Sequence, residues 1–212
     1  MFFSHVCEVG VYLPATSNIL DFIQDGIRAT LVEADPVTAE KIKEYFKEYA
    51  INLFSVAIWD TNGVLKLSKA AASTFAAELK QSPAIVNDHY RVSKENTFEV
   101  PCKVFSEIDD GTIDLLSIDI EGGEWYVIKH LTSNPKIISI ETHGKYYTNP
   151  FLHEISEWMR IKGYTIWYKD TSDTVFVRKD VFSPGLADKL KIRVVELIIS
   201  WKKFKKIFKQ RN

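Results

Sequence analysis

Cysteine is scarce in this chain of 212 residues, which has only two, and no group of cysteine and histidine has the spacing of a zinc site. Cys7 and Cys102 lie in apolar stretches far apart in the sequence. That arrangement is typical of reduced thiols buried in a core rather than of a disulfide framework. The cysteine content therefore predicts a protein of a reducing compartment, and we expect it to be cytoplasmic.

Long apolar runs are also absent. No run reaches the roughly 18 residues that a membrane-spanning helix requires, and residues 1–10 lack the basic, apolar and small-residue regions of a secretory signal. We therefore expect neither a membrane span nor a signal peptide. Hydrophobic residues make up 46% of the chain, which suits one sizeable domain with a well-filled core.

Charge is distributed unevenly along the chain, although the formal net charge is only −1. Residues 183–212 contain nine Lys/Arg against two Asp/Glu, which leaves 18 basic and 26 acidic residues in residues 1–182. We predict two parts, an α/β domain over residues 1–182 and a basic amphipathic helical tail over residues 183–212.

Strand-like and helix-like segments alternate through the first part. Alternation with short connections predicts a parallel sheet covered on both faces, and the short link before the last strand predicts that this strand is antiparallel. Asn62-Gly63 stands between two apolar runs, 51–58 and 64–67, which predicts a hairpin. Residues 68–96 have weaker periodicity and are expected to form either a long loop with functional side chains or a surface excursion with one short helix. Strands are expected over 4–9, 29–32, 51–58, 64–67, 98–105, 113–120, 136–140, 164–168 and 175–177, and helices over 15–26, 37–49, 124–131 and 151–162.

Acidic residues stand at the ends of three expected strands, at Glu8, Glu33 and Asp119. Ligands bind at the carboxyl edge of such sheets, where an acid about 20 residues beyond the first turn accepts hydrogen bonds from ribose hydroxyls. The first turn, from Gly10 to Asn18, lacks the G-x-G-x-x-G pattern that holds a pyrophosphate, which disfavours a nicotinamide oxidoreductase. S-adenosylmethionine fits better, because it offers an adenosine to Glu33 and a cationic end to the other carboxylates.

The central stretch Ile113–Trp125, I-D-L-L-S-I-D-I-E-G-G-E-W, resembles the I-D-x-L-K-I-D-V-E-G-x-E signature of the FkbM-type S-adenosylmethionine-dependent O-methyltransferases. The resemblance covers roughly residues 4–178. It implies a Rossmann-like seven-stranded methyltransferase fold and methyl transfer to a hydroxyl of a sugar, polyketide or other secondary metabolite. The chain departs from the family pattern at Glu8, Pro14 and Ser117, where the family has aspartate, glycine and lysine. Further motifs that resemble the family are Val6–Gly10, Leu31–Pro36, Val56–Gly63 and Ile138–His143.

The resemblance and the strand-end positions together give a set of candidate site residues. Glu33 is expected on the ribose, Ala57 beside the adenine, Asp119 between cofactor and substrate, and Glu121 or His143 as the general base. Clustered acids can also hold a divalent ion, but we predict no required metal. The predicted cofactor-binding residues are Glu8, Gly10, Tyr12, Glu33, Ala34, Ala57 and Asp119. The predicted catalytic residues are Asp119, Glu121 and His143, and the predicted substrate-binding residues are Asn87, Asp88, Tyr90, Glu124 and Lys145.

The predicted function is methylation of a hydroxylated small molecule or glycan, and the alternative is a catalytically silent scaffold that acts through the tail. Apolar residues recur at helical spacing through 186–208, beside many lysines. Such a helix could lie on a membrane surface, pair with another chain in a homo-oligomer, or pack on its own body. Packing on the body or in a dimer is the favoured interpretation, and no nucleic-acid partner is expected.

Overall fold

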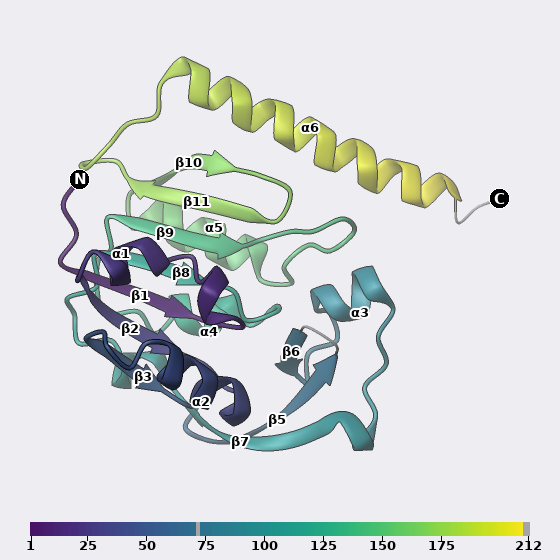
Figure 1. Cartoon of the computed structure of the whole chain (residues 1–212). Helices are drawn as coiled ribbons and strands as arrows, with labels where there is room; N and C mark the ends of the chain where they lie inside the picture. The colour runs from purple at the N-terminus through teal and green to yellow at the C-terminus, as the bar shows by residue number, and fades with distance from the viewer. Residues whose placement is uncertain (71–72, 210–212) are drawn as a thin grey trace.

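A seven-stranded sheet forms the centre of the protein (Figure 1). The computed structural model describes residues 1–70 and 73–209, without the side chains of residues 88 and 206–209. The strand order is β10–β11–β9–β8–β1–β2–β3, in which β9 to β3 run parallel and β11 runs antiparallel to both neighbours. This confirms the predicted Rossmann-like α/β sheet with an antiparallel last strand. The strands are β1 His5–Val9, β2 Arg28–Val32, β3 Ile51–Phe54, β8 Leu115–Ile118, β9 Ile137–Glu141, β10 Tyr164–Lys169 and β11 Asp173–Arg178.

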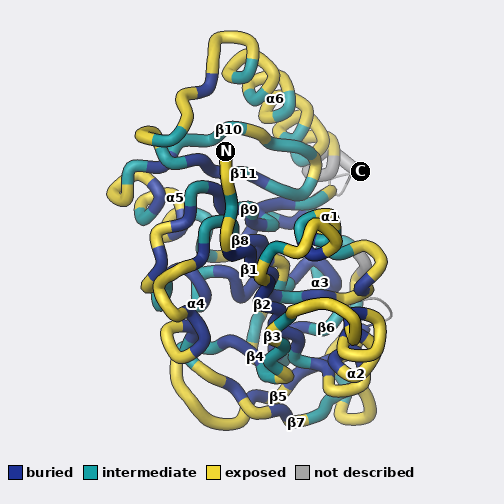
Figure 2. The backbone as a smooth tube through the Cα atoms, turned by 60° about the vertical axis from the view of Figure 1, so that its left-hand side comes forward, coloured by how far each residue is buried: buried dark blue, intermediate teal, exposed yellow. Residues whose placement is uncertain are grey.

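Helices cover both faces of this sheet, because successive strand residues point to opposite sides. Val6 packs against α1 and α2, whereas Cys7 packs against α4 and α5. Every residue of β1 is buried, and Figure 2 shows the inner strands mostly in dark blue. The helices are α1 Leu20–Gln24, α2 Pro36–Tyr45, α3 Pro83–Asp88, α4 Glu124–Ile128, α5 Leu152–Ile161 and α6 Leu186–Lys209, with three short 3-10 turns at η1 Pro14–Thr16, η2 Lys94–Asn96 and η3 Phe105–Glu107.

A second sheet of four strands in the order β4–β7–β5–β6 lies beside the carboxyl ends of β1 and β2. The hairpin predicted at Asn62-Gly63 is wrong, because β7 lies between β4 and β5 and pairs with both. Asn62 instead accepts a hydrogen bond from the Val104 amide at 2.9 Å, which ties the turn to the end of β7. The strand predicted over 51–58 is divided between the two sheets. The strands of the second sheet are β4 Ala57–Ile58, β5 Gly63–Ala70, β6 Ser73–Ala76 and β7 Thr97–Lys103.

The segment 68–96, predicted to be a loop, contains regular structure at both ends. It includes the end of β5, then β6 and α3, which begins with Ser82 accepting a hydrogen bond from the Ile85 amide. Pro83 follows at the first helical position, where its missing N–H costs nothing. This segment therefore forms a wall beside the main sheet rather than a loose excursion.

The C-terminal helix α6 was predicted correctly as an amphipathic helix, and it lies across the edge strand β10 (Figure 1). Glu196 pairs with Lys169 of β10 at 3.5 Å. Within residues 1–70 and 73–209, no helix combines the length and apolar composition needed to cross a bilayer. The boundary at residues 182 and 183 stays a prediction.

Candidate functional site

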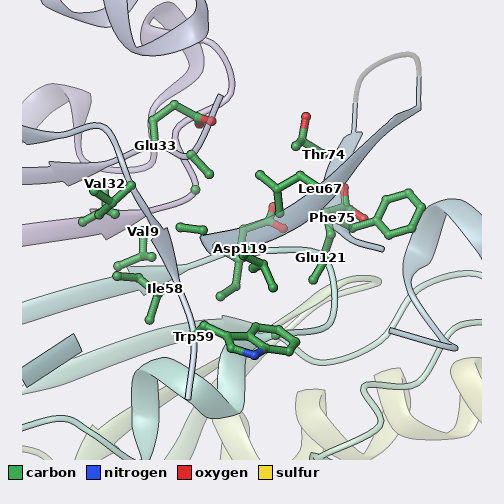
Figure 3. Close-up of a pocket in the computed structure, with 18 of the residues that line it drawn as sticks. Val9, Val32, Glu33, Ile58, Trp59, Leu67, Thr74, Phe75, Asp119 and Glu121 are labelled. Carbon is green, nitrogen blue, oxygen red and sulfur yellow. The ribbon is translucent and has the colours of Figure 1, made fainter. Parts of the chain in front are cut away.

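A pocket opens where β1, β2 and β8 end, and the second sheet closes its other side. Its cavity volume is about 110 Å³, and the pocket continues into open solvent. Figure 3 shows Asp119 and Glu121 pointing into it between Glu33 on one side and Phe75 on the other. The predicted site residues that line the pocket are Gly10, Tyr12, Glu33, Ala34, Ala57, Asp119 and Glu121.

Gly10 makes the floor of the pocket possible. Its φ of +94° favours glycine, and a Cβ atom there would lie 1.8 Å from the carbonyl oxygen of Asp119. The Asp119 amide also donates to the carbonyl of Val9 at 2.9 Å. The backbone at Gly10 therefore packs directly against the Asp119 carbonyl, and no side chain at position 10 fills the pocket.

Glu33 lies at the end of β2 and is 7% exposed. Its Oε1 accepts a hydrogen bond from the Asp35 amide at 2.7 Å, and the residue lines the pocket. Burial, together with repulsion from the neighbouring Asp35, raises the pKa of Glu33 to about 7. Asp35 itself caps α2 and pairs with Lys69 of β5, which joins the second sheet to the first. Near neutral pH, Glu33 therefore exists both as a protonated carboxyl, which can donate a hydrogen bond, and as a charged carboxylate, which can only accept.

Three carboxylates gather beneath the pocket. Oxygen atoms of Asp119, Glu124 and Glu141 lie within 4.8 Å of one another. Burial raises the pKa of Asp119 well above its usual range, and Glu121 and Glu124 add repulsion. Burial also raises the pKa of Glu141 to about 10. Asp119 is exposed to solvent on its pocket side, but protein surrounds its other sides. For this reason its pKa is raised even though the residue is exposed.

No lysine or arginine of the described part of the chain forms an ion pair with these three carboxylates. The buried Oε2 of Glu141 also has no hydrogen-bond partner there. Uncompensated buried charge is costly, so the cluster favours either shared protons or a bound cation. The oxygen set is compatible with a divalent ion and equally with the positive end of an organic cofactor.

Glu124, predicted to bind substrate, lies beneath the pocket instead. It is fully buried, and its Oε1 accepts hydrogen bonds from the amides of Ile120 and Gly122 at 3.1 and 2.9 Å. Asn149 donates to its other oxygen. Glu124 therefore fixes the turn that carries Glu121, whose φ of +58° is unusual for a side chain of this size.

His143, predicted as a possible general base, is buried among β9, β11 and the loop after β10. Its Nε2 donates to the carbonyl of Asp170 at 2.8 Å, and its Nδ1 bonds to the Thr142 hydroxyl at 2.7 Å. Burial lowers the pKa of His143. Both ring nitrogens are occupied and the ring does not line the pocket, so the geometry assigns His143 a structural position.

Glu8, predicted to bind cofactor, points away from the pocket lining. Its carboxylate accepts a hydrogen bond from the Ser17 hydroxyl and another from the Asn18 amide at 3.0 Å. Pro14 begins the short 3-10 turn η1 in the same segment. Glu8 thus organises the first turn from behind, which leaves Gly10 and Tyr12 on the pocket side.

Three other predicted substrate residues, Asn87, Tyr90 and Lys145, do not line the pocket. Asn87 Oδ1 accepts hydrogen bonds from the amides of Tyr146 and Tyr147 at 2.9 and 3.1 Å, which joins α3 to the loop after β9. Tyr90 donates to the Lys69 carbonyl at 2.6 Å. Lys145 is exposed, with its ammonium 5.2 Å from the Tyr146 ring centroid. The side chain of Asp88 lies outside the described residues.

Sequence reasoning missed the wall that the second sheet supplies. This wall is mainly apolar, and Trp59 packs against Tyr126 of α4 with the ring centroids 4.2 Å apart and the ring planes at 41°. Residues 64–67 were predicted as a strand, but Ser73–Ala76, S-T-F-A, has no period-2 alternation that would have indicated its partner strand. The missed lining residues from this wall are Ile58, Trp59, Leu65, Leu67, Ser73, Thr74, Phe75, Ala76 and Leu79.

Comparison of the chain with curated proteins found no match. Similar solved structures include magnesium protoporphyrin IX methyltransferase from Synechocystis PCC 6803 with bound SAM, at 10% identity and a TM-score of 0.43, covering 82% of this chain and 69% of that one. The methyltransferase domain of bacterial CtHen1 is 13% identical with a TM-score of 0.43, covering 82% and 90% of the two chains.

The strongest match is to a sequence family. Residues 8–166 match the family described as the methyltransferase FkbM domain. This match spans three quarters of the chain and includes every strand end that lines the pocket. The chain therefore belongs to the FkbM methyltransferase family.

Proposed function

We propose that the protein transfers the methyl group of S-adenosylmethionine to a hydroxyl of a small molecule or glycan. The observation that carries this proposal is the pocket itself, at the ends of β1, β2 and β8, with Glu33 and Asp119 on opposite sides. When bound, the cofactor supplies an electrophilic methyl group on a positively charged sulfur. The pocket residues fit such a group, because the lining combines the carboxylates Glu33, Asp119 and Glu121 with apolar side chains.

Each pocket residue has a role in this proposal. Oε2 of Glu33 accepts hydrogen bonds from the ribose hydroxyls, since Oε1 is already occupied. Ala57 and Ile58 of β4 offer an apolar surface for the adenine. The close approach at Gly10 leaves room for the amino-acid end beside Tyr12.

Glu121 is the proposed general base. It lines the pocket beside Asp119, and the turn that carries it is fixed by Glu124. A carboxylate here can take the proton that the acceptor hydroxyl loses as its oxygen forms the new bond to carbon. Asp119, between Gly10 and Glu121, holds the boundary between cofactor and acceptor.

The experiment that tests this function is transfer of a labelled methyl group to a panel of hydroxylated acceptors, beginning with sugars. We expect labelled product with the wild type, and a loss of about 100-fold or more in kcat with Glu121→Gln. His143→Gln is the matched control, and we expect its kcat to stay within about threefold of the wild type once folded protein is compared. Equal loss in both variants, or full activity in Glu121→Gln, would contradict the assignment of the base.

A further inference from the structure

The contact between α6 and the rest of the protein is narrow. The half-buried side chains of α6 recur every three or four residues, so they form one face of the helix. None of the α6 side chains that the structure describes belongs to a hydrophobic core cluster. Figure 2 shows most of α6 in yellow, the colour of exposed residues. The half-buried members are Asp188, Ile192, Val195, Ile199 and Lys203.

The opposite face of α6 is apolar and exposed, although Leu190, Val194 and Ile198 also line an open groove between α6 and β10. At 3.6 residues per turn, its members lie on a stripe centred roughly 180° around the helix from the half-buried face. Leu197 is 70% exposed and Trp201 is 58% exposed. Exposed apolar stripes of this length are rare on soluble proteins and mark interaction surfaces. The stripe consists of Leu186, Leu190, Val194, Leu197, Ile198, Trp201 and Phe204.

Basic side chains flank this stripe on both sides. Lys189 and Arg193 lie along one edge, and Lys191 and Lys202 lie along the other. Lys205 lies beside the stripe with its ammonium 3.5 Å from the Trp201 ring centroid. Residues 183–212 carry nine basic residues against two acidic ones. Long basic side chains in these positions can reach past an apolar face toward phosphate groups.

We propose that α6 is an interfacial helix that binds the surface of an anionic lipid bilayer. The apolar stripe would lie at the level of the headgroups, and the two basic edges would contact lipid phosphates. A second copy of α6 is a poorer occupant, because it would bring equally charged edges together. The helix lies at the outside of the molecule, beyond β10 (Figure 1), so the acidic body is held away from the negative surface.

The helix also touches the rim of the candidate site. Lys203 donates to the hydroxyl of Thr148, which follows the tyrosines that Asn87 holds. Binding of α6 to a bilayer would therefore place this rim near the membrane surface. This inference concerns the surface of α6 and does not depend on the proposed methyl transfer.

Co-sedimentation of the full-length protein with vesicles tests the inference. One set of vesicles contains phosphatidylcholine alone, and the other contains phosphatidylcholine mixed with phosphatidylglycerol. We expect at least about tenfold more bound protein with the mixed vesicles, and loss of most of that binding at high salt. Equal or no binding to the two kinds of vesicle would overturn the proposal.

Two exposed-site variants and a control give the test its specificity. Leu197→Ser with Trp201→Ser should lower vesicle binding about tenfold or more, and Lys191→Gln with Lys202→Gln should lower it selectively for anionic vesicles. Ile161→Ser, at a 66% exposed position of α5, is the matched control and should bind like the wild type. A concentration-dependent dimer in gel filtration that the Leu197→Ser and Trp201→Ser changes abolish, with vesicle binding unchanged, would overturn the proposal in favour of a protein interface.

Discussion

The chemistry of the candidate site depends on a few residues with unusual surroundings. Glu33 and Asp119 line one pocket from two strands, and burial raises the pKa of each carboxyl. The sequence placed both at strand ends, because an acid in an apolar run stands out. It could not show that Glu8 and Glu124 turn away from the pocket, because this depends on the folded turns that bring hydrogen-bond donors to the two carboxylates.

Glu33 predicts a pH dependence of cofactor binding. The ionised carboxylate accepts hydrogen bonds from a diol, and its pKa is about 7 in the free protein. The affinity for S-adenosylhomocysteine should therefore rise about tenfold between pH 6 and pH 8. Calorimetric titration of Glu33→Gln should give an affinity about 10 to 100 times lower at pH 8, without this pH dependence. The same pH dependence in the variant would show that Glu33 does not bind the ribose.

At Gly10 we predict that adding one methyl group strongly lowers the free energy of unfolding. Gly10→Ala should lower the free energy of unfolding by about 3 kcal/mol or more, because the new Cβ would meet the Asp119 carbonyl at 1.8 Å. Gly26→Ala is a matched control, since Gly26 also has a positive φ of +78° but no atom within 4 Å of the added Cβ. That control should cost only about 1 kcal/mol in chemical denaturation. Equal costs would show that the close approach at Gly10 is unimportant.

At the scale of elements, the main sheet was predictable and the second sheet was not. The alternation of apolar strands and amphipathic helices gave the parallel order and the antiparallel last strand. The hairpin prediction at Asn62-Gly63 was wrong because it considered only neighbouring residues. The turn connects β4 to β5, but β7 lies between these two strands, and it follows more than 30 residues later in the sequence. Long-range pairing of this kind has no signal within a short window. The wall formed by β5 and β6 is a local pairing, and it was missed because residues 73–76 have no period-2 alternation of apolar and polar side chains.

We predict that Asn87 stabilises the contact between α3 and the loop after β9. Asn87→Ala leaves the amides of Tyr146 and Tyr147 without their acceptor, which should cost about 2 kcal/mol of stability. The acceptor KM should rise while the affinity for S-adenosylhomocysteine stays unchanged, because Asn87 does not line the cofactor pocket. Asn52→Ala on the exposed side of β3 is the control. A loss of cofactor affinity in Asn87→Ala would show that the rim also shapes the cofactor site.

For the whole molecule, the concentration of buried acids at one sheet edge sets the pH profile of stability. Glu33 and Glu124 have folded-state pKa values of about 7, raised above the ordinary value of 4.5. The folded protein therefore holds more protons than the unfolded chain between these values. Its stability is greatest below about pH 4.5 with respect to these groups and falls as pH rises through 7.

Thermal or chemical denaturation between pH 5 and pH 8 measures this effect. The free energy of unfolding should fall with rising pH, and Glu33→Gln should remove a part on the order of 3 kcal/mol. The comparison is between variants at each pH, since the paired aspartates such as Asp110 lose stability only at much lower pH. Identical slopes in wild type and variant would show that Glu33 keeps its ordinary pKa in the folded protein.

The most direct test of the account is calorimetric titration of the full chain with S-adenosylmethionine, in parallel with Glu33→Gln. The account predicts one site per chain with a dissociation constant in the micromolar range, about −8 kcal/mol, and a clear loss of affinity in the variant. An absence of heat, together with no thermal shift from the cofactor, would contradict it and favour a methyltransferase fold that serves as a scaffold through α6.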